Sequence, residues 1–111
     1  MVTPSVGLVV LVPFPFSDLS RAKLRPAVVL ADAGKDDWIL CQITSNPYSD
    51  PRAIMLTDAG FQAGSLQVTS YVRPGQLFTA NSTLMTTQVG NLKDQVLKSI
   101  VDTIISILAG R

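Results

Sequence analysis

Short runs of β-branched and other apolar residues recur along most of the chain, separated by polar or turn-forming segments. The runs cover residues 7–12, 26–31, 38–44 and 53–56, and a longer alternating stretch covers residues 67–78. Runs of this length, bounded by Gly, Pro, Asn and Asp, are typical of β-strands. Within the longest stretch, Pro74 and Gly75 predict a bend or a hairpin, because proline cannot donate to a strand ladder.

The C-terminal segment has a different period. Between residues 92 and 108, apolar side chains recur at helical spacing at Val96, Ile100, Ile104 and Leu108. Polar side chains cover the other side: Lys93, Asp94, Lys98, Ser99, Asp102 and Thr103. This pattern predicts a long amphipathic helix that Gly110 ends, and the piece before it, up to Gly90, is predicted to be irregular or helical. We therefore expect one mainly β (α+β) domain over residues 1–111, closed by a helix.

Residues 13–24 separate the first two predicted strands. Pro13 and Pro15 are expected to end the first strand at residue 12. In the loop itself, residues 17–25 carry three basic side chains and one acidic one, a local net charge of +2, whereas the whole chain is only +1. A chain so close to neutral has no uniformly basic surface. Any binding of nucleic acid must therefore depend on this local patch.

The chain has no histidine and one cysteine. This composition excludes an internal disulfide, Ser-His-Asp and Cys-His catalytic groups, and histidine-based metal sites. Cys41 lies in an apolar run and is expected to be a small buried side chain rather than a nucleophile. An enzyme of this composition must use Arg, Lys, Asp, Tyr, hydroxyl or backbone groups.

The N-terminus lacks the charged segment of a signal peptide, and the apolar runs are far shorter than a membrane span. A cytoplasmic location is expected.

Three motifs occur in order along the chain. The first is Gly7 with Val9–Val12, Pro13-Phe14-Pro15-Phe16 and Arg25-Pro26-Ala27-Val28-Val29-Leu30; the second is Ile43-Thr44-Ser45-Asn46; the third is Ser70-Tyr71-Val72-Arg73 followed by Leu77-Phe78-Thr79. Together they resemble the MazF/PemK family, the toxin ribonucleases of bacterial toxin–antitoxin pairs, and the third motif is typical of its PemK-like branch. Leu8 stands where the family usually has an acidic residue.

The resemblance implies a fold and a function. The fold would be an SH3-like β-barrel of the CcdB/PemK type with a long C-terminal helix. The function would be that of a metal-independent endoribonuclease without a cofactor, which cuts single-stranded mRNA at short sequences and leaves a 2′,3′-cyclic phosphate and a 5′-hydroxyl. The partners would be a second copy of the chain and a cognate antitoxin that covers the RNA groove.

The resemblance also assigns site residues. Arg25 and Thr44 would be catalytic, with Thr44 at the end of the third predicted strand. The residues expected to bind RNA are Ser17, Arg21, Lys23, Ser45, Asn46 and Arg73. The loop at residues 17–25 is expected to supply affinity and to select the cut sequence, and the available stacking side chains are Phe14, Phe16, Tyr48 and Tyr71.

The chemistry of the two catalytic candidates is consistent with slow phosphoryl transfer. A planar guanidinium bridges two phosphate oxygens and stays cationic, and a threonine hydroxyl can donate one further hydrogen bond. Neither group is an effective base near neutral pH, since arginine titrates above about 12. We therefore expect slow cleavage that depends on holding the attacking and leaving oxygens of the substrate in line with the phosphorus.

Two non-enzymatic alternatives stay open at this stage. CcdB-type gyrase poisons share this barrel but end in Trp-Gly-Ile, whereas this chain ends Leu108-Ala109-Gly110-Arg111. A homologue that binds RNA or an antitoxin without cutting is the other, because Arg25 and Thr44 would also serve for RNA binding alone.

Overall fold

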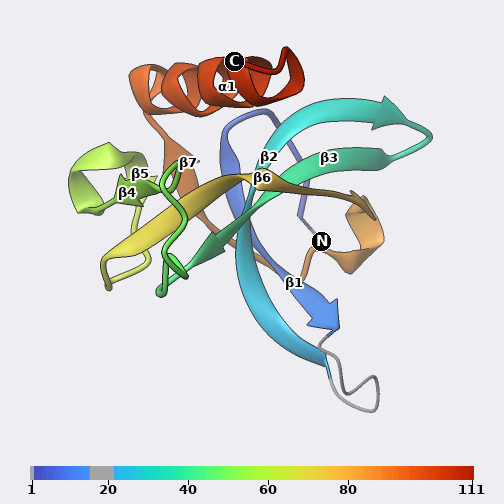
Figure 1. Cartoon of the computed structure of the whole chain (residues 1–111). Helices are drawn as coiled ribbons and strands as arrows, with labels where there is room; N and C mark the ends of the chain where they lie inside the picture. The colour runs from blue at the N-terminus through green and yellow to red at the C-terminus, as the bar shows by residue number, and fades with distance from the viewer. Residues whose placement is uncertain (1, 16–21) are drawn as a thin grey trace.

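In the part of the chain that the computed structural model describes, residues 2–15 and 22–111, a curled antiparallel sheet carries one C-terminal helix (Figure 1). The strands are β1 (Leu8–Pro15), β2 (Ala22–Gly34), β3 (Asp37–Thr44), β4 (Ile54–Leu56), β5 (Phe61–Gly64), β6 (Ser70–Asn81) and β7 (Thr87–Leu92). Two short 3-10 turns, η1 (Asp58–Gly60) and η2 (Ser82–Leu84), precede β5 and β7, and α1 spans Asp94–Leu108. The prediction of a mainly β fold closed by a helix is confirmed.

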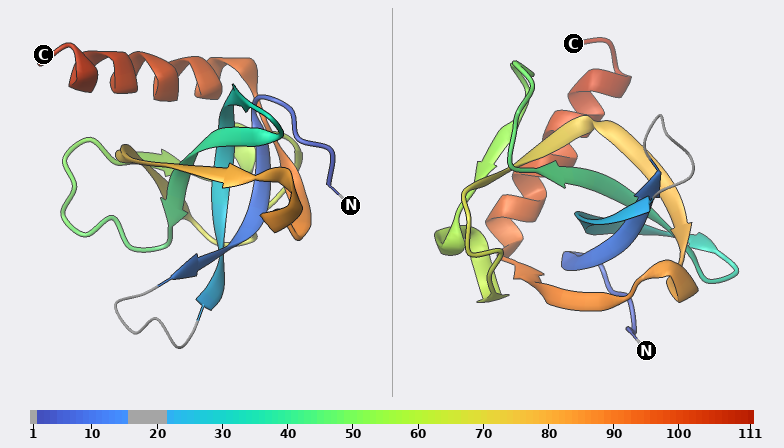
Figure 2. Two further views of the ribbon diagram at one scale, coloured as in Figure 1. Left: turned by 90° about the vertical axis from the view of Figure 1, so that its right-hand side faces the viewer. Right: turned by 90° about the horizontal axis from the view of Figure 1, so that it is seen from below.

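The strand order is β4-β6-β3-β2-β1-β7-β5, so the first three strands form the middle of the sheet. Both faces of these strands are buried. Val9 and Val28 belong to the core under α1, while Val10 and Val29 belong to a second core on the opposite face. The curl that produces this second core is visible in the right-hand view of Figure 2. Continuous apolar runs rather than alternating ones are the sequence pattern expected of strands covered on both faces.

Helix α1 lies across one end of the sheet (Figures 1 and 2). Ile100 and Ile104 are buried against the sheet, and Val96 packs on the same core. Leu108 continues the helical spacing but is 76% exposed. The apolar stripe on the helix is longer than the sheet that it covers.

The prediction that Pro13 and Pro15 end the first strand is wrong. Strand β1 runs to Pro15 and pairs with β2 through Pro13↔Leu24 and Pro15↔Ala22. The carbonyl oxygen of Leu11 accepts a hydrogen bond from the Thr86 N–H at 3.0 Å, which shows that the polar backbone groups of Leu11 face β7. Pro13 and Pro15 lie two and four residues further on and face the same side, beyond the last β1–β7 pair. Their missing N–H groups therefore remove no ladder hydrogen bond.

Pro74 and Gly75 bend a strand rather than make a hairpin. Strand β6 is continuous, and it pairs Val72 with Ile43 but Leu77 with Cys41, so several of its residues bulge opposite Gln42. The predicted bend is confirmed and the alternative hairpin is wrong. The strand also begins at Ser70, three residues later than predicted.

The piece predicted to be irregular or helical before α1 is strand β7, which pairs with β1 and β5. This prediction failed because β7 has little apolar alternation of its own, and its pairing partners decide its structure. Gly90 allows β5 to approach closely, since a Cβ atom at this position would lie 2.3 Å from the Ala63 carbonyl oxygen. An alanine there would force the two strands apart.

Cys41 is fully buried, as predicted. Its thiol donates a hydrogen bond to the Arg73 carbonyl oxygen at 3.0 Å, next to the bulge in β6. Burial, with a smaller effect from the charge of Asp50, raises the pKa of the thiol to about 12. The side chain therefore stays protonated and serves packing rather than chemistry.

Candidate active site

A groove with a volume of about 360 Å³ lies where the start of β2, the end of β3 and the segment before β6 meet. Its lining residues are Leu11, Lys23, Leu24, Arg25, Pro26, Ile43, Thr44, Ser45, Leu66, Val68 and Ser70. Both residues predicted to be catalytic are among them, together with two residues predicted to bind RNA, Lys23 and Ser45. The fold thus gathers residues from both sides of the long first loop and from the end of β3.

Arg25 and Thr44 occupy corresponding positions on adjacent strands. The antiparallel register of β2 and β3 pairs Ala27 with Gln42; when this register is extended by two residues, Arg25, two residues before Ala27, corresponds to Thr44, two residues after Gln42. Since residues two apart in a strand point to the same face, the two side chains share one face of the sheet. Arg25 is half-buried and sits opposite Val12 of β1, between Leu24 and Pro26. Pairing with β1 therefore holds the backbone of Arg25 in a fixed place beside the groove.

Thr44 ends β3 and is only 5% exposed. Its Oγ1 accepts a hydrogen bond from the Asn46 N–H at 3.2 Å, which turns the chain out of the strand. The hydroxyl keeps a proton that it can donate to a phosphate oxygen. The residue therefore combines a turn function with a possible donor function.

The segment between β3 and β4, residues 45–53, is organised by side-chain to backbone hydrogen bonds. Asn46 Oδ1 accepts from the Tyr48 N–H at 2.9 Å, and Asp50 Oδ1 accepts from the Arg52 N–H at 2.9 Å. Arg73 of β6 forms an ion pair with Asp50, with 3.2 Å between Nε and Oδ2. The Arg52 N–H first, and then Arg73, lower the pKa of the Asp50 carboxyl. This ion pair therefore persists at neutral and mildly acidic pH.

The remaining predicted RNA-binding residues are placed differently. Asn46 is exposed next to the groove, and Arg73 is not among the residues that line it. The guanidinium of Arg73 instead engages Asp50 and lies over the Tyr48 ring, 5.2 Å from its centroid. Ser17 and Arg21 lie outside the described residues, as does Phe16, so the part of the basic loop that they form stays a prediction.

Sequence reasoning missed one wall of the groove. Val68 comes from the stretch that was predicted to begin a strand at residue 67, and Leu66 lies just before it; Val68 is 61% exposed. Ser70 Oγ donates to the Val68 carbonyl oxygen at 3.2 Å. Gln42 was also missed: its Oε1 is buried without a hydrogen-bond partner among the described residues, two positions before Thr44 on the same strand. Nothing in the order of residues indicates that segment 65–70 folds back beside β2.

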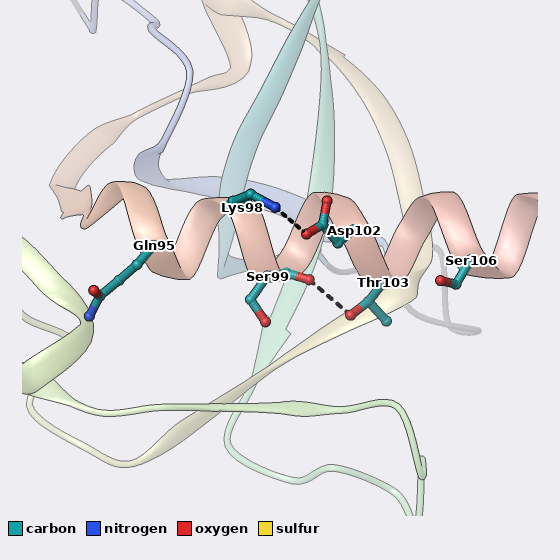
Figure 3. A pocket seen from close by; sticks show the side chains of 6 residues that line it. All are labelled: Gln95, Lys98, Ser99, Asp102, Thr103 and Ser106. Carbon is teal, nitrogen blue, oxygen red and sulfur yellow. Dashed lines mark hydrogen bonds and ion pairs between the residues drawn. The ribbon is translucent and has the colours of Figure 1, made fainter.

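A second hollow, of about 410 Å³, lies on the polar side of α1 (Figure 3). It is lined by Gln95, Lys98, Ser99, Asp102, Thr103 and Ser106, all from the helix. Their mutual interactions are local: Lys98 Nζ donates to Asp102 Oδ2 at 2.7 Å, and Thr103 Oγ1 donates to the Ser99 carbonyl oxygen at 2.8 Å. This is a solvated helix face without converging chemical groups.

The family model described as "PemK-like, MazF-like toxin of type II toxin-antitoxin system" matches residues 5–108. The chain belongs to this toxin family. The match covers nearly the whole PemK/MazF-like chain, including all three motifs and α1, and confirms the resemblance seen in the sequence. A comparison with curated protein sequences finds no match.

Solved structures of the PemK/MazF-like fold agree. MazF from Deinococcus radiodurans is 21% identical, with a TM-score of 0.74 over 98% of this chain and 99% of that chain. The MazE-MazF complex (Form-II) from the same organism gives 20% identity and a TM-score of 0.77 over 97% of each chain. An endoribonuclease in complex with its cognate antitoxin from a mycobacterial species gives 13% identity and a TM-score of 0.75 over 96% of each. At these identities the likeness establishes a common fold, which confirms the predicted fold type.

Among residues 2–15 and 22–111, no helix is long and apolar enough to cross a membrane. The same described residues contain no group of three Cys, Asp or Glu side chains that could hold a metal ion.

Proposed function

We propose that the protein is the toxin of a type II toxin–antitoxin pair and cleaves single-stranded RNA without a metal ion. The observation that carries the proposal is the placement of Arg25 and Thr44 at corresponding positions of adjacent strands, in a groove that also includes Lys23 and Ser45. Membership of the PemK/MazF-like toxin family supports the same activity.

In the proposed reaction, the 2′-oxygen of one nucleotide attacks the adjacent phosphorus as the bond from phosphorus to the 5′-oxygen breaks. The products are a 2′,3′-cyclic phosphate and a 5′-hydroxyl, and the proton lost by the 2′-hydroxyl is balanced by the one gained at the 5′-oxygen. Arg25 would stabilise the charge on the equatorial oxygens and Thr44 would donate a hydrogen bond to them. With neither residue suited to act as a base, cleavage would depend on in-line positioning in the groove.

The test is to incubate the purified protein with a long RNA in EDTA and to map the new ends by primer extension. Cleavage at repeated short sequences, with 5′-hydroxyl ends, would support the proposal. RNA that is bound but remains intact would instead favour the second candidate, a family member that binds RNA or an antitoxin without cutting it. RNA that is neither bound nor cut would contradict both.

Lys23 is expected to supply affinity without sequence information. It is exposed and lines the groove, a position suited to a phosphate contact. In Lys23→Ala, affinity should fall alike for all RNA sequences, and the slope of log affinity against log salt should fall by about 0.7, the value for one contact to single-stranded nucleic acid. Fluorescence anisotropy at several salt concentrations measures this, with Lys35→Ala, in the distant β2–β3 turn, as the control. A loss confined to one RNA sequence would contradict this role.

We further propose that the protein is a twofold homodimer whose grooves lie near the interface, and that an antitoxin covers them. Apolar side chains exposed on the described surface include Val6, Leu24, Met55, Val68 and Leu84, each about half exposed or more. Such a surface is suited to a protein partner. Sedimentation at micromolar concentration should give a species of about twice 11.9 kDa. A species of 11.9 kDa alone would contradict the dimer.

A further inference from the structure

Tyr48 is a large aromatic side chain held in an exposed position. Its residue is 57% exposed, at a segment that projects from the sheet between β3 and β4 (Figure 2, left). Tyr48 and Ser49 both have positive φ angles, 52° and 57°, which are uncommon for residues other than glycine. A backbone of this kind persists only where neighbouring groups hold it, and here it directs an aromatic ring away from the core.

Three interactions hold the Tyr48 backbone and the side chain that covers its ring. The Tyr48 N–H donates to Asn46 Oδ1, and the Arg73 guanidinium lies over the ring at 5.2 Å from the centroid. Arg73 is itself fixed, because its Nε forms the ion pair with Asp50. The guanidinium thus covers one face of the ring, while Tyr48 as a whole remains 57% exposed. An aromatic ring that is already held on one face by a guanidinium loses little conformational freedom when a flat group stacks on it.

The backbone of Tyr48 is also tied to the groove. Thr44 Oγ1 accepts from the Asn46 N–H, and Asn46 Oδ1 accepts from the Tyr48 N–H, so two consecutive hydrogen bonds join the groove to the Tyr48 backbone. Four residues of chain span at most about 14 Å, which keeps Tyr48 within a few nucleotides of any phosphate held at Thr44.

We propose that Tyr48 is a stacking platform for one unpaired base of the RNA substrate, with Arg73 as the residue that positions its ring. The inference rests on the proposed function and adds to it a defined subsite outside the groove. It also changes the role expected for Arg73, from a phosphate contact to a support for the aromatic ring. Stacking is tolerant of base identity, so the subsite sets where the RNA strand lies more than which base it presents.

The experiment uses oligonucleotides that span a mapped cleavage site and carry a 2′-deoxy sugar at the cleaved position, so that they bind but are not cut. A series of these, each lacking one base, is titrated against wild type, Tyr48→Ala, Tyr48→Phe and Arg52→Ala. For wild type, removal of one particular base should weaken binding about 5- to 150-fold, the range measured for aromatic stacking. In Tyr48→Ala, binding should be weaker by a similar factor, and removal of that same base should have no further effect.

The other two variants separate stacking from charge and fold. Tyr48→Phe keeps the ring, so the removal of each base should weaken its binding by the same factor as in wild type. Arg52→Ala removes an exposed charge from the same segment and should weaken binding to every oligonucleotide alike. Circular dichroism and thermal unfolding establish that each variant is folded.

Two results would overturn the inference while leaving the proposed function intact. The first is a Tyr48→Ala variant in which the removal of each base changes the binding affinity by the same factor as in wild type. The second is a Tyr48→Ala variant that binds RNA normally but changes its sedimentation, which would assign the ring to a protein–protein contact. Wild-type protein that neither binds nor cuts RNA would overturn the proposed function together with the subsite.

Discussion

Arg25→Ala is expected to lower the rate of RNA cleavage about 10²- to 10³-fold, the usual cost of losing one preorganised donor to a transition state. Arg25 is half-buried in β2, at the position that corresponds to Thr44 on β3, and its backbone is constrained by Pro26. In the proposed reaction, its charge would stabilise the negative charge that develops on the phosphate oxygens. Single-turnover cleavage of a short RNA, with protein in excess, measures the chemical step directly.

Two further variants make the test specific. Arg25→Lys keeps the charge but loses the planar fork, so it should recover only part of the lost rate. Lys35→Ala removes a positive charge from the exposed β2–β3 turn, far along both strands from the groove, and should cleave at the wild-type rate. An Arg25→Ala variant that is folded and cleaves within tenfold of wild type would refute the catalytic assignment.

Ile100→Ala is expected to lower the free energy of unfolding by about 2–5 kcal/mol. Ile100 is fully buried on α1 and packs in the core shared with Val9, Val28 and Ile43. Removing its side chain leaves a cavity beneath the helix that the surrounding sheet fills only in part. Urea unfolding followed by circular dichroism should show a lower midpoint with an unchanged slope.

Ile105→Ala is the matched control, because it makes the same substitution on the same helix at a position that is 50% exposed. Its effect on stability should be small, and the better helix propensity of alanine offsets part of any lost contact. Equal losses at both positions would mean that α1 packs on the sheet by a different face. Since α1 lines no part of the groove, cleavage by folded Ile100→Ala at low temperature should stay at the wild-type rate.

The sequence and the structure agree best where a pattern is repeated. The apolar runs at residues 7–12 and 26–31 predicted two strands, and both faces of these strands are covered by packed cores. The spacing of Ile100 and Ile104 predicted the buried face of α1, and the burial of Cys41 followed from its apolar run. The presence of turn-forming residues alone was a weaker guide. Pro13 and Pro15 lie within a strand, because their backbone nitrogen atoms face away from β2 and no hydrogen bond to β2 is lost.

By itself, the sequence of this PemK/MazF-like protein determined the mainly β class and the terminal helix, because each depends on residue type and short-range spacing. The two catalytic candidates came from the resemblance of its motifs to the family. Only the tertiary structure decided which residues lie next to one another across the sheet. Strand register brings Arg25 opposite Thr44, and the fold sets Leu66 and Val68 beside them as one wall of the groove. It also takes Arg73 to Asp50 and Tyr48, 23 and 25 positions earlier in the chain. Pairing between strands depends on hydrogen bonds and packing between residues far apart in the sequence. The local pattern around any one of these residues therefore does not indicate its partner.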